Sequence, residues 1–147
     1  MIVPATLAHA EAIAANPRPA DVAEIEASHG ATVMDAMRLG MPHGARTGLV
    51  DGVAVCMFGV VPEGDAGVPW MVSSAAMDSL RVQKALLRLS PSIIAGMRAT
   101  GRPLCNAVDD RNEAAKRWLA WLGFTLEAPV AAGVEGRPFR FFHWSPR

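Results

Sequence analysis

The side chains that could carry acid–base, nucleophilic or metal chemistry are few in this sequence. Glu63 and Asp65 lie in a short Gly-rich stretch, where a carboxylate could act as a general base, although such a stretch is also typical of a solvated turn. Ser73-Ser74 resembles a strand end with a helix cap and not a nucleophile elbow. The four histidines show no metal-ligand spacing: His9, His29, His43 and His143. We therefore predict no metal site and assign no catalytic residue.

Composition excludes several classes of protein. The chain has 147 residues, with 14 Lys and Arg against 14 Asp and Glu and 51% hydrophobic residues. A disordered chain needs low hydrophobicity and high net charge, and a nucleic-acid binder usually carries a basic excess on one face. The longest apolar run, residues 53–61, is too short to cross a bilayer. We expect one soluble globular domain over residues 1–147, with no nucleic-acid partner and no membrane segment.

The two cysteines, Cys56 and Cys105, are far apart in the sequence, and each lies between apolar neighbours. Such residues are usually small buried hydrophobic side chains rather than a disulfide pair or a metal site. A reducing compartment fits this usage. The N-terminus also lacks the basic region and apolar stretch of an export signal.

Hydrophobic spacing gives the order of elements that must position any site. The predicted strands span residues 2–5, 47–50, 53–61, 68–73, 104–108, 124–128 and 138–144. The predicted helices span residues 7–14, 19–29, 31–39, 79–100 and 110–122. Asp51-Gly52 between two apolar runs indicates a tight hairpin, Pro91 should kink or split the fourth helix, and Asp110 is the expected N-cap of the fifth. This order predicts an α/β domain with a mixed sheet.

Several stretches resemble a known superfamily. The run from Asn112 to Phe124 looks like the Asn-x-x-Ala to Leu-Gly-Phe segment of the GNAT acetyltransferases, and residues 3–13 resemble their first strand and helix. A closer resemblance is to the internal virion protein A family of tailed phages, which are GNAT-like. It rests on residues 19–25, 57–62, 69–70, 106–109, 111–112, 117–119 and 121–124. The resemblance implies a GNAT-like fold: a central, mostly antiparallel mixed sheet with helices on both faces.

The same resemblance names a cofactor site for acetyl-CoA. In the family, backbone groups at the positions of Met71 and Val72 pair with the pantetheine arm, and Arg81 and Asn112 would complete the site. Two family features are missing. The loop that should cradle the pyrophosphate with glycines contains none between Gly67 and Gly96, and Leu119 occupies the position of a frequent Tyr acid. Arg81, with Lys84 and Arg88, also fits a solvated helix face, and Asn112 a position in a capped helix turn.

These departures lead us to expect a catalytically degenerate protein with no cofactor, acting as a structural or interaction component of a phage virion. Its partners would be other virion proteins or a host protein, and it could form an oligomer. Its location would be the virion or the host cytoplasm. The alternative is an acetyl-CoA-dependent N-acetyltransferase acting on an unknown amine, and a third possibility is an acyl-CoA binder without turnover.

Aromatic residues near the C-terminus suggest where a partner would bind. The helix carrying Trp118 and Trp121 has more apolar surface than one stripe against a sheet requires. In the last strand, Phe139 and Phe141 alternate with Phe142 and Trp144, so both strand faces are apolar. Such a strand is either covered on both sides or engaged with a partner.

Overall fold

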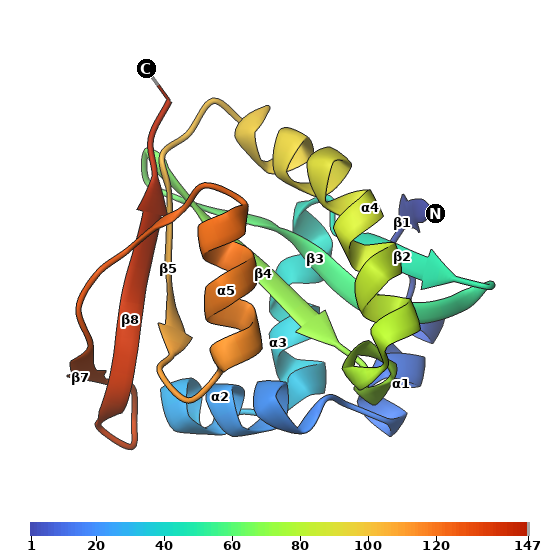
Figure 1. Ribbon diagram of the computed structural model, residues 1–147, viewed down its shortest axis with the longest axis horizontal. Coiled ribbons are helices and arrows are strands. Elements are labelled where there is room, and N and C mark those ends of the chain that lie inside the picture. Colours follow the sequence, from blue (N-terminus) through green and yellow to red (C-terminus); the bar gives the residue numbers. More distant parts are fainter. Residues whose placement is uncertain (147) are drawn as a thin grey trace.

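The computed structural model describes residues 1–146 and shows one sheet between two layers of helices (Figure 1). The strands lie in the order β1-β2-β3-β4-β5-β8-β6, with β7 also paired to β8. Only β4 and β5 are parallel neighbours; the other pairs are antiparallel. This confirms the predicted α/β fold with a mostly antiparallel mixed sheet.

The bounds of the elements agree closely with the hydrophobic spacing. The strands are β1 (Ile2–Pro4), β2 (Arg46–Val50), β3 (Val53–Glu63), β4 (Ala66–Ser73), β5 (Leu104–Asp109), β6 (Thr125–Leu126), β7 (Val130–Ala132) and β8 (Arg137–Trp144). The α-helices are α1 (Leu7–Ala15), α2 (Pro19–His29), α3 (Val33–Gly40), α4 (Leu80–Arg98) and α5 (Glu113–Trp121). Two short 3₁₀ helices are η1 (Met41–His43) and η2 (Ala75–Asp78). The short strand β7 was not predicted.

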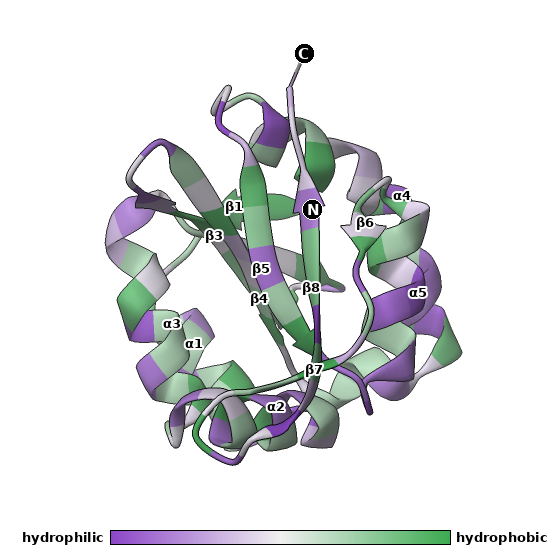
Figure 2. Cartoon of the chain, turned by 90° about the vertical axis from the view of Figure 1, so that its left-hand side faces the viewer, coloured by the Kyte–Doolittle hydropathy of each residue, from purple (hydrophilic) through white to green (hydrophobic). Residues whose placement is uncertain are grey.

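Each face of the sheet has its own hydrophobic core. One core is formed by α4 and α5 against the sheet and includes Ile93, Leu119 and Phe142. The other is formed by α1 and α3 against β3 and β4 and includes Ile13, Met37 and Met57. In Figure 2 the strands between these layers are largely green, because both of their faces are apolar where helices cover them.

Local signals explain most element ends. Asp51 and Gly52 both have positive φ and form the tight turn between β2 and β3, which confirms that prediction. Pro91 does not split α4, which continues to Arg98. The Ser90 hydroxyl donates to the carbonyl of Leu86 at 2.7 Å within the turn that Pro91 disturbs. The predicted loop at residues 62–67 is a tighter hairpin, because Glu63 pairs with Ala66.

Two further expectations were wrong. Asn112, and not Asp110, caps α5: its side-chain oxygen accepts from the Ala115 N–H at 3.4 Å. Asp110 instead pairs with Lys116 and Arg140. Cys56 is buried as predicted, but Cys105 is exposed, on the strand face opposite to buried Leu104 and Val108.

The C-terminal aromatic residues divide between core and surface. Trp118 is half-buried and its indole N–H donates to the Ser90 hydroxyl at 2.9 Å, whereas Trp121 is 60% exposed. On β8, Phe139 and Phe142 are buried on opposite faces, and Phe141 is 48% exposed. Each face of the last strand therefore has one buried Phe and is covered only in part.

Candidate functional site

The two parallel strands at the centre of the sheet separate after a single paired position. The ladder between β4 and β5 contains only Gly67 opposite Leu104. One step further along, the side-chain amide of Asn106 donates to the carbonyl of Pro69 at 2.8 Å and so spans the widening gap. In Figure 1 the two strands diverge: β5 ends above α2, and β4 ends nearer to α1. The splay between β4 and β5 is the main candidate site.

The backbone of β4 presents every second residue to this splay. Backbone groups of consecutive strand residues alternate between the two neighbouring strands. The N–H and C=O of Ser73 are bonded on the splay side, so those of Met71 face the splay as well. Val72, opposite Met57, faces β3 instead. Of the two backbone positions predicted for the cofactor, Met71 borders the splay and Val72 does not.

The connection between α1 and α2 occupies the end of the β4 edge. The Arg18 N–H donates to the Ser73 carbonyl at 3.0 Å, and the Ala75 N–H donates to the Asn16 carbonyl at 2.8 Å. Between these bonds, Pro17 and Ser74 form an antiparallel bridge. The chain therefore adds its own short strand segment to the edge that opens beyond Pro69.

Helix α2 provides one carboxylate to each of the two diverging strand ends. Asp21 accepts from the Ser73 N–H at 2.7 Å, at the end of β4. Glu24, one turn later on the same helix face, accepts from the Asp109 N–H at 2.8 Å, at the end of β5. Strand ends that no longer pair with each other are thus both bonded to α2.

A charged network completes this arrangement. The Arg18 guanidinium donates to Asp21 at 3.1 Å and to the Asn112 side-chain oxygen at 3.2 and 3.3 Å. The Asn112 amide in turn donates to Glu24 at 3.4 Å. We call Arg18, Asp21, Glu24 and Asn112 the α2 cluster. Asn112 is only 4% exposed, so the predicted residue is both the cap of α5 and a member of this cluster.

Burial changes the protonation of the two carboxyls. It raises the pKa of Glu24 to about 7, although the Asp109 N–H bond lowers it. Burial also raises the pKa of Asp21, against the lowering effects of the Ser73 N–H and of Arg18. Glu24 is therefore a group that can take up or release a proton near neutral pH.

Several backbone amides in the segment after β4 are already bonded within the chain. In η2 and its flanks, the N–H groups of Ala76 and Met77 bond to Ser74, and that of Ser79 bonds to the Ala76 carbonyl. The Asp78 carboxylate faces Arg18 at 3.4 Å, which places a negative charge beside this turn. Amides that are already bonded are not available to a phosphate group.

Arg81 lies apart from the α2 cluster. Its guanidinium pairs with Asp51 at the β2–β3 turn, and both side chains are well exposed. Glu63 and Asp65 are also exposed, at the tip of the β3–β4 hairpin. The four residues predicted for the cofactor are therefore not brought together as one site: only Met71 and Asn112 border the splay region.

Sequence reasoning missed Arg18, Asp21 and Glu24. The available signal was the spacing of two acids three residues apart, just after the helix-starting Pro19, which places both on one helix face. A small pocket of about 210 Å³ adjoins them and is lined by Ala20, Ala23, Asp109, Arg111 and Asn112. Among residues 1–146 no group of three or more His, Cys, Asp or Glu side chains is arranged to hold a metal ion. Within the same residues, no helix is both long and apolar enough to cross a membrane.

We compared the sequence and the structure with those of known proteins. No protein-family profile and no curated protein matches the sequence. Solved structures do match along the whole chain. A GNAT-family acetyltransferase from Bacillus anthracis has a TM-score of 0.71 at 11% identity, covering 98% of this chain and 93% of its own. A GCN5-related N-acetyltransferase from Kribbella flavida has a TM-score of 0.68 at 19% identity, covering 99% and 97%.

A third similar structure holds the cofactor. The phosphinothricin acetyltransferase of the GNAT superfamily from Sinorhizobium meliloti, in complex with acetyl-CoA, has a TM-score of 0.65 at 13% identity and covers 98% of this chain and 86% of its own. At these identities the likeness concerns the backbone arrangement. This chain has the fold of the GNAT acetyltransferases.

Proposed function

We propose that this protein uses the GNAT fold as a scaffold for binding other macromolecules and does not transfer acetyl groups. One observation carries the proposal: the chain itself occupies the edge of the splay. Of the four β4 residues that face it, Gly67 bonds Pro103, Pro69 bonds Asn106, and Ser73 bonds Arg18 and Asp21. Only Met71 is left.

A pantetheine arm would need more than this single position. An extended ligand that pairs with a strand edge uses donors and acceptors at every second residue. Pro69 has no N–H to offer, and the bonds of Ser73 would have to be broken. For the phosphate groups, the same conclusion is supported by the Asp78 carboxylate and by the bonded N–H groups of Ala76, Met77 and Ser79.

The test is a calorimetric titration with acetyl-CoA up to millimolar concentration. We expect no saturable heat and no thermal shift. A Kd below about 100 μM, roughly −5.5 kcal/mol, would contradict the proposal. The variant Met71→Pro removes the one N–H left at the edge, so any binding that it abolishes would be assigned to the splay.

The second candidate is an acetyl-CoA-dependent N-acetyltransferase acting on an amine. Its support is the fold, the unpaired position at Met71, and Glu24, whose pKa of about 7 suits a proton acceptor. Release of coenzyme A thiol from acetyl-CoA with a panel of amines tests it. Turnover that falls about a hundredfold in Glu24→Gln, with folding intact, would establish this function.

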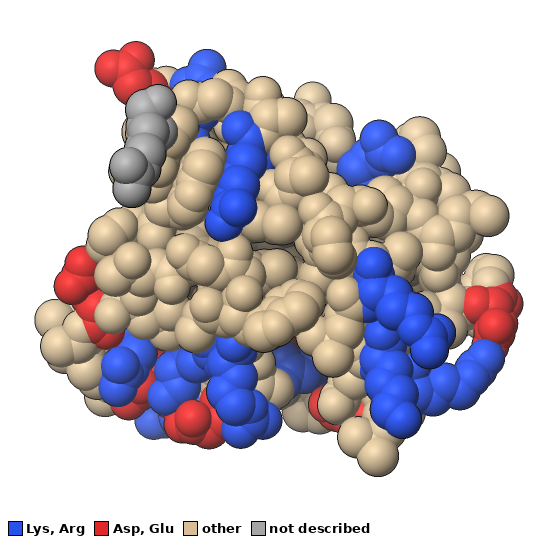
Figure 3. All heavy atoms as spheres, turned by 45° about the horizontal axis from the view of Figure 1, so that its top comes forward, with Lys and Arg blue, Asp and Glu red and all other residues tan. Residues whose placement is uncertain are grey.

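The proposal extends to the proteins that this scaffold would bind. The resemblance to phage internal virion proteins supports virion or host proteins as partners. Exposed Trp121 and Phe141 provide apolar contact area, and Lys, Arg, Asp and Glu are interspersed around an uncharged stretch on the face in Figure 3. Immunodetection in density-purified phage particles is expected to find the protein. Its presence only in the unbound fraction of infected cells would contradict a virion role.

A further inference from the structure

A second hollow lies on the α4 face of the sheet and shares no lining residue with the splay. Its volume is about 500 Å³, and it lies between the C-terminal half of α4 and the strands β1, β2 and β3, with η1 at one end. Volumes of about 300–1,000 Å³ are typical of small-molecule sites. Nothing in the GNAT-like arrangement of β4 and β5 accounts for this hollow.

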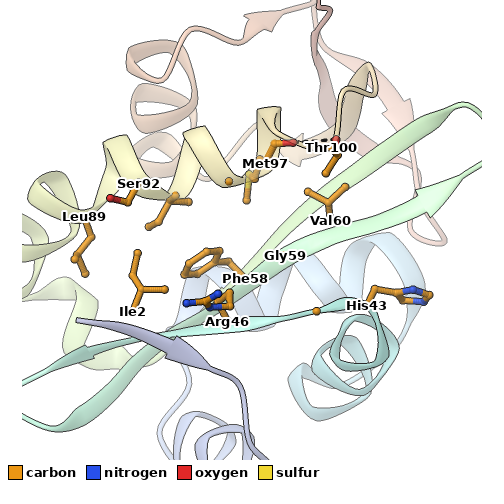
Figure 4. A pocket seen from close by; sticks show the side chains of 13 residues that line it. Ile2, His43, Arg46, Phe58, Gly59, Val60, Leu89, Ser92, Met97 and Thr100 are labelled. Atoms are coloured by element: carbon orange, nitrogen blue, oxygen red, sulfur yellow. Dashed lines mark hydrogen bonds between the residues drawn. The ribbon is translucent and has the colours of Figure 1, made fainter.

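The lining of the hollow combines apolar side chains with a few polar ones, and Arg46 is its one Lys or Arg residue. Phe58, Ile93 and Met97 belong to the apolar part and are themselves largely buried. Arg46 stands opposite Phe58 in the β2–β3 ladder, on the sheet face that α4 covers. Figure 4 shows Arg46 beside Phe58, between Ile2 on one side and Val60 on the other.

Arg46 has no counterion. Among residues 1–146 its guanidinium makes no ion pair and no side-chain hydrogen bond, and no acidic residue lines the hollow. A guanidinium offers paired N–H donors that match a carboxylate. The Arg46 side chain is exposed at this hollow, so its guanidinium is free to bind a ligand that carries one anionic group.

The hollow also has room above this cation. Gly96 lines it from α4, and a Cβ built there would meet no atom within 4 Å. Ser92, one turn earlier on α4, adds a hydroxyl on the same side. An apolar chain could therefore lie along Ile93 and Met97 while its charged end contacts Arg46.

We propose that this hollow binds an aliphatic carboxylate. The carboxylate accepts from the Arg46 guanidinium, and the alkyl chain packs against Phe58, Ile93 and Met97. The site is independent of the splay and of acetyl transfer, so it holds whichever function the splay has.

Sodium octanoate is the probe, titrated into the full-length protein by calorimetry and by amide chemical-shift mapping. We expect saturable one-to-one binding, with the largest shifts at Gly59 and Gly96. Arg46→Met keeps an unbranched side chain but removes the charge, and it should weaken binding about tenfold. Gly96→Leu should fill the hollow and abolish binding, while the thermal midpoint stays equal or rises. Arg88→Ala, on exposed α4 surface, is the matched control and should bind as the wild type does.

Two further ligands distinguish the contribution of the alkyl chain from that of the carboxylate. 1-Octanol carries the chain without the charge, and acetate carries the charge without the chain; each should bind at least about tenfold more weakly than octanoate. Absence of saturable octanoate binding would overturn the proposal. So would binding that both Arg46→Met and Gly96→Leu leave unchanged, or octanol binding as tight as that of octanoate.

Discussion

The splay between β4 and β5 and the hollow beneath α4 are both gaps against the same sheet, but their polar groups are in opposite states. In the splay, the Ser73 N–H, the Asp109 N–H and the Arg18 guanidinium all bond to α2 or to residues that contact it. In the hollow, Arg46 forms no ion pair with any of residues 1–146. The polar groups that border the splay are thus paired within the chain, whereas the exposed guanidinium of Arg46 is available to a ligand.

The largest expected effect is a loss of stability when one carboxylate beside the splay is removed. Asp21→Ala leaves the Ser73 N–H without its acceptor and Arg18 without its closest ion-pair partner, both in buried surroundings. We expect a loss of about 3 kcal/mol in the free energy of unfolding, measured in urea. Asp65→Ala, at the exposed hairpin tip, is the control and should change stability by less than about 0.5 kcal/mol. A similar small loss for both variants would show that the α2 cluster does not hold the splay closed.

The second effect is a dependence on pH. The pKa of Glu24 in the folded protein is about 7, above its usual value of 4.5, so the folded state binds the proton more tightly than the unfolded state. The contribution of this group to stability is greatest below about pH 4.5 and is lost as the pH rises through 7, a fall of about 3 kcal/mol. Asp21, with its pKa also raised, adds a fall of the same sign.

Chemical unfolding at pH 5 and pH 7.5 measures this slope. Glu24→Gln should remove most of it and be more stable than the wild type at pH 7.5. Glu26→Gln, an exposed position on the same helix, should keep the wild-type slope. A wild-type stability that rises over this range would mean that Glu24 is not held in buried surroundings.

A smaller effect separates helix capping from the α2 cluster. Asn112 caps α5 and also bonds Arg18, whereas Ser79 caps α4 by accepting from the Val82 N–H and has no further partner in the cluster. We expect Asn112→Ala to cost about 2 kcal/mol and Ser79→Ala about 1 kcal/mol, by thermal and urea unfolding. Equal costs would mean that the contact with Arg18 adds nothing.

The smallest effect tests the space under α4. Gly96→Ala should stabilise the protein by about 0.5–1 kcal/mol, because the new methyl group meets open space and alanine favours a helix. At Gly40 the same change places a methyl group inside the Trp70 ring, so it should be clearly destabilising. Thermal midpoints of the two variants measure this contrast. Destabilisation by Gly96→Ala would show that the hollow is filled.

The sequence predicted the elements well because their signals are local. The Asp51-Gly52 turn and the apolar stripe of α4 follow from spacing within a few residues. The cap of α5 was assigned to Asp110 instead of Asn112, because the ion pairs of Asp110 with Lys116 and Arg140 depend on tertiary contacts. The exposure of Cys105 was missed for a similar reason, since apolar neighbours do not reveal which strand face a helix covers.

The candidate site was less accessible to sequence reasoning. Asn112 was identified, but its partners Arg18 and Glu24 are 94 and 88 residues away in the chain. Arg81 was assigned to the cofactor through the family resemblance, and the structure pairs it with Asp51. A backbone edge such as that of β4 has no sequence signature, so its occupation by residues 16–18 becomes visible only in three dimensions.

The long sequence separations in the α2 cluster have a consequence for the kinetics of folding. Glu24 and Asp109 are 85 residues apart, so their contact closes a large loop, and we expect it to form late in folding. Contacts made this late are weak in the folding transition state, and their loss mainly speeds unfolding. The α2 cluster is therefore expected to set the unfolding rate of the protein more than its folding rate.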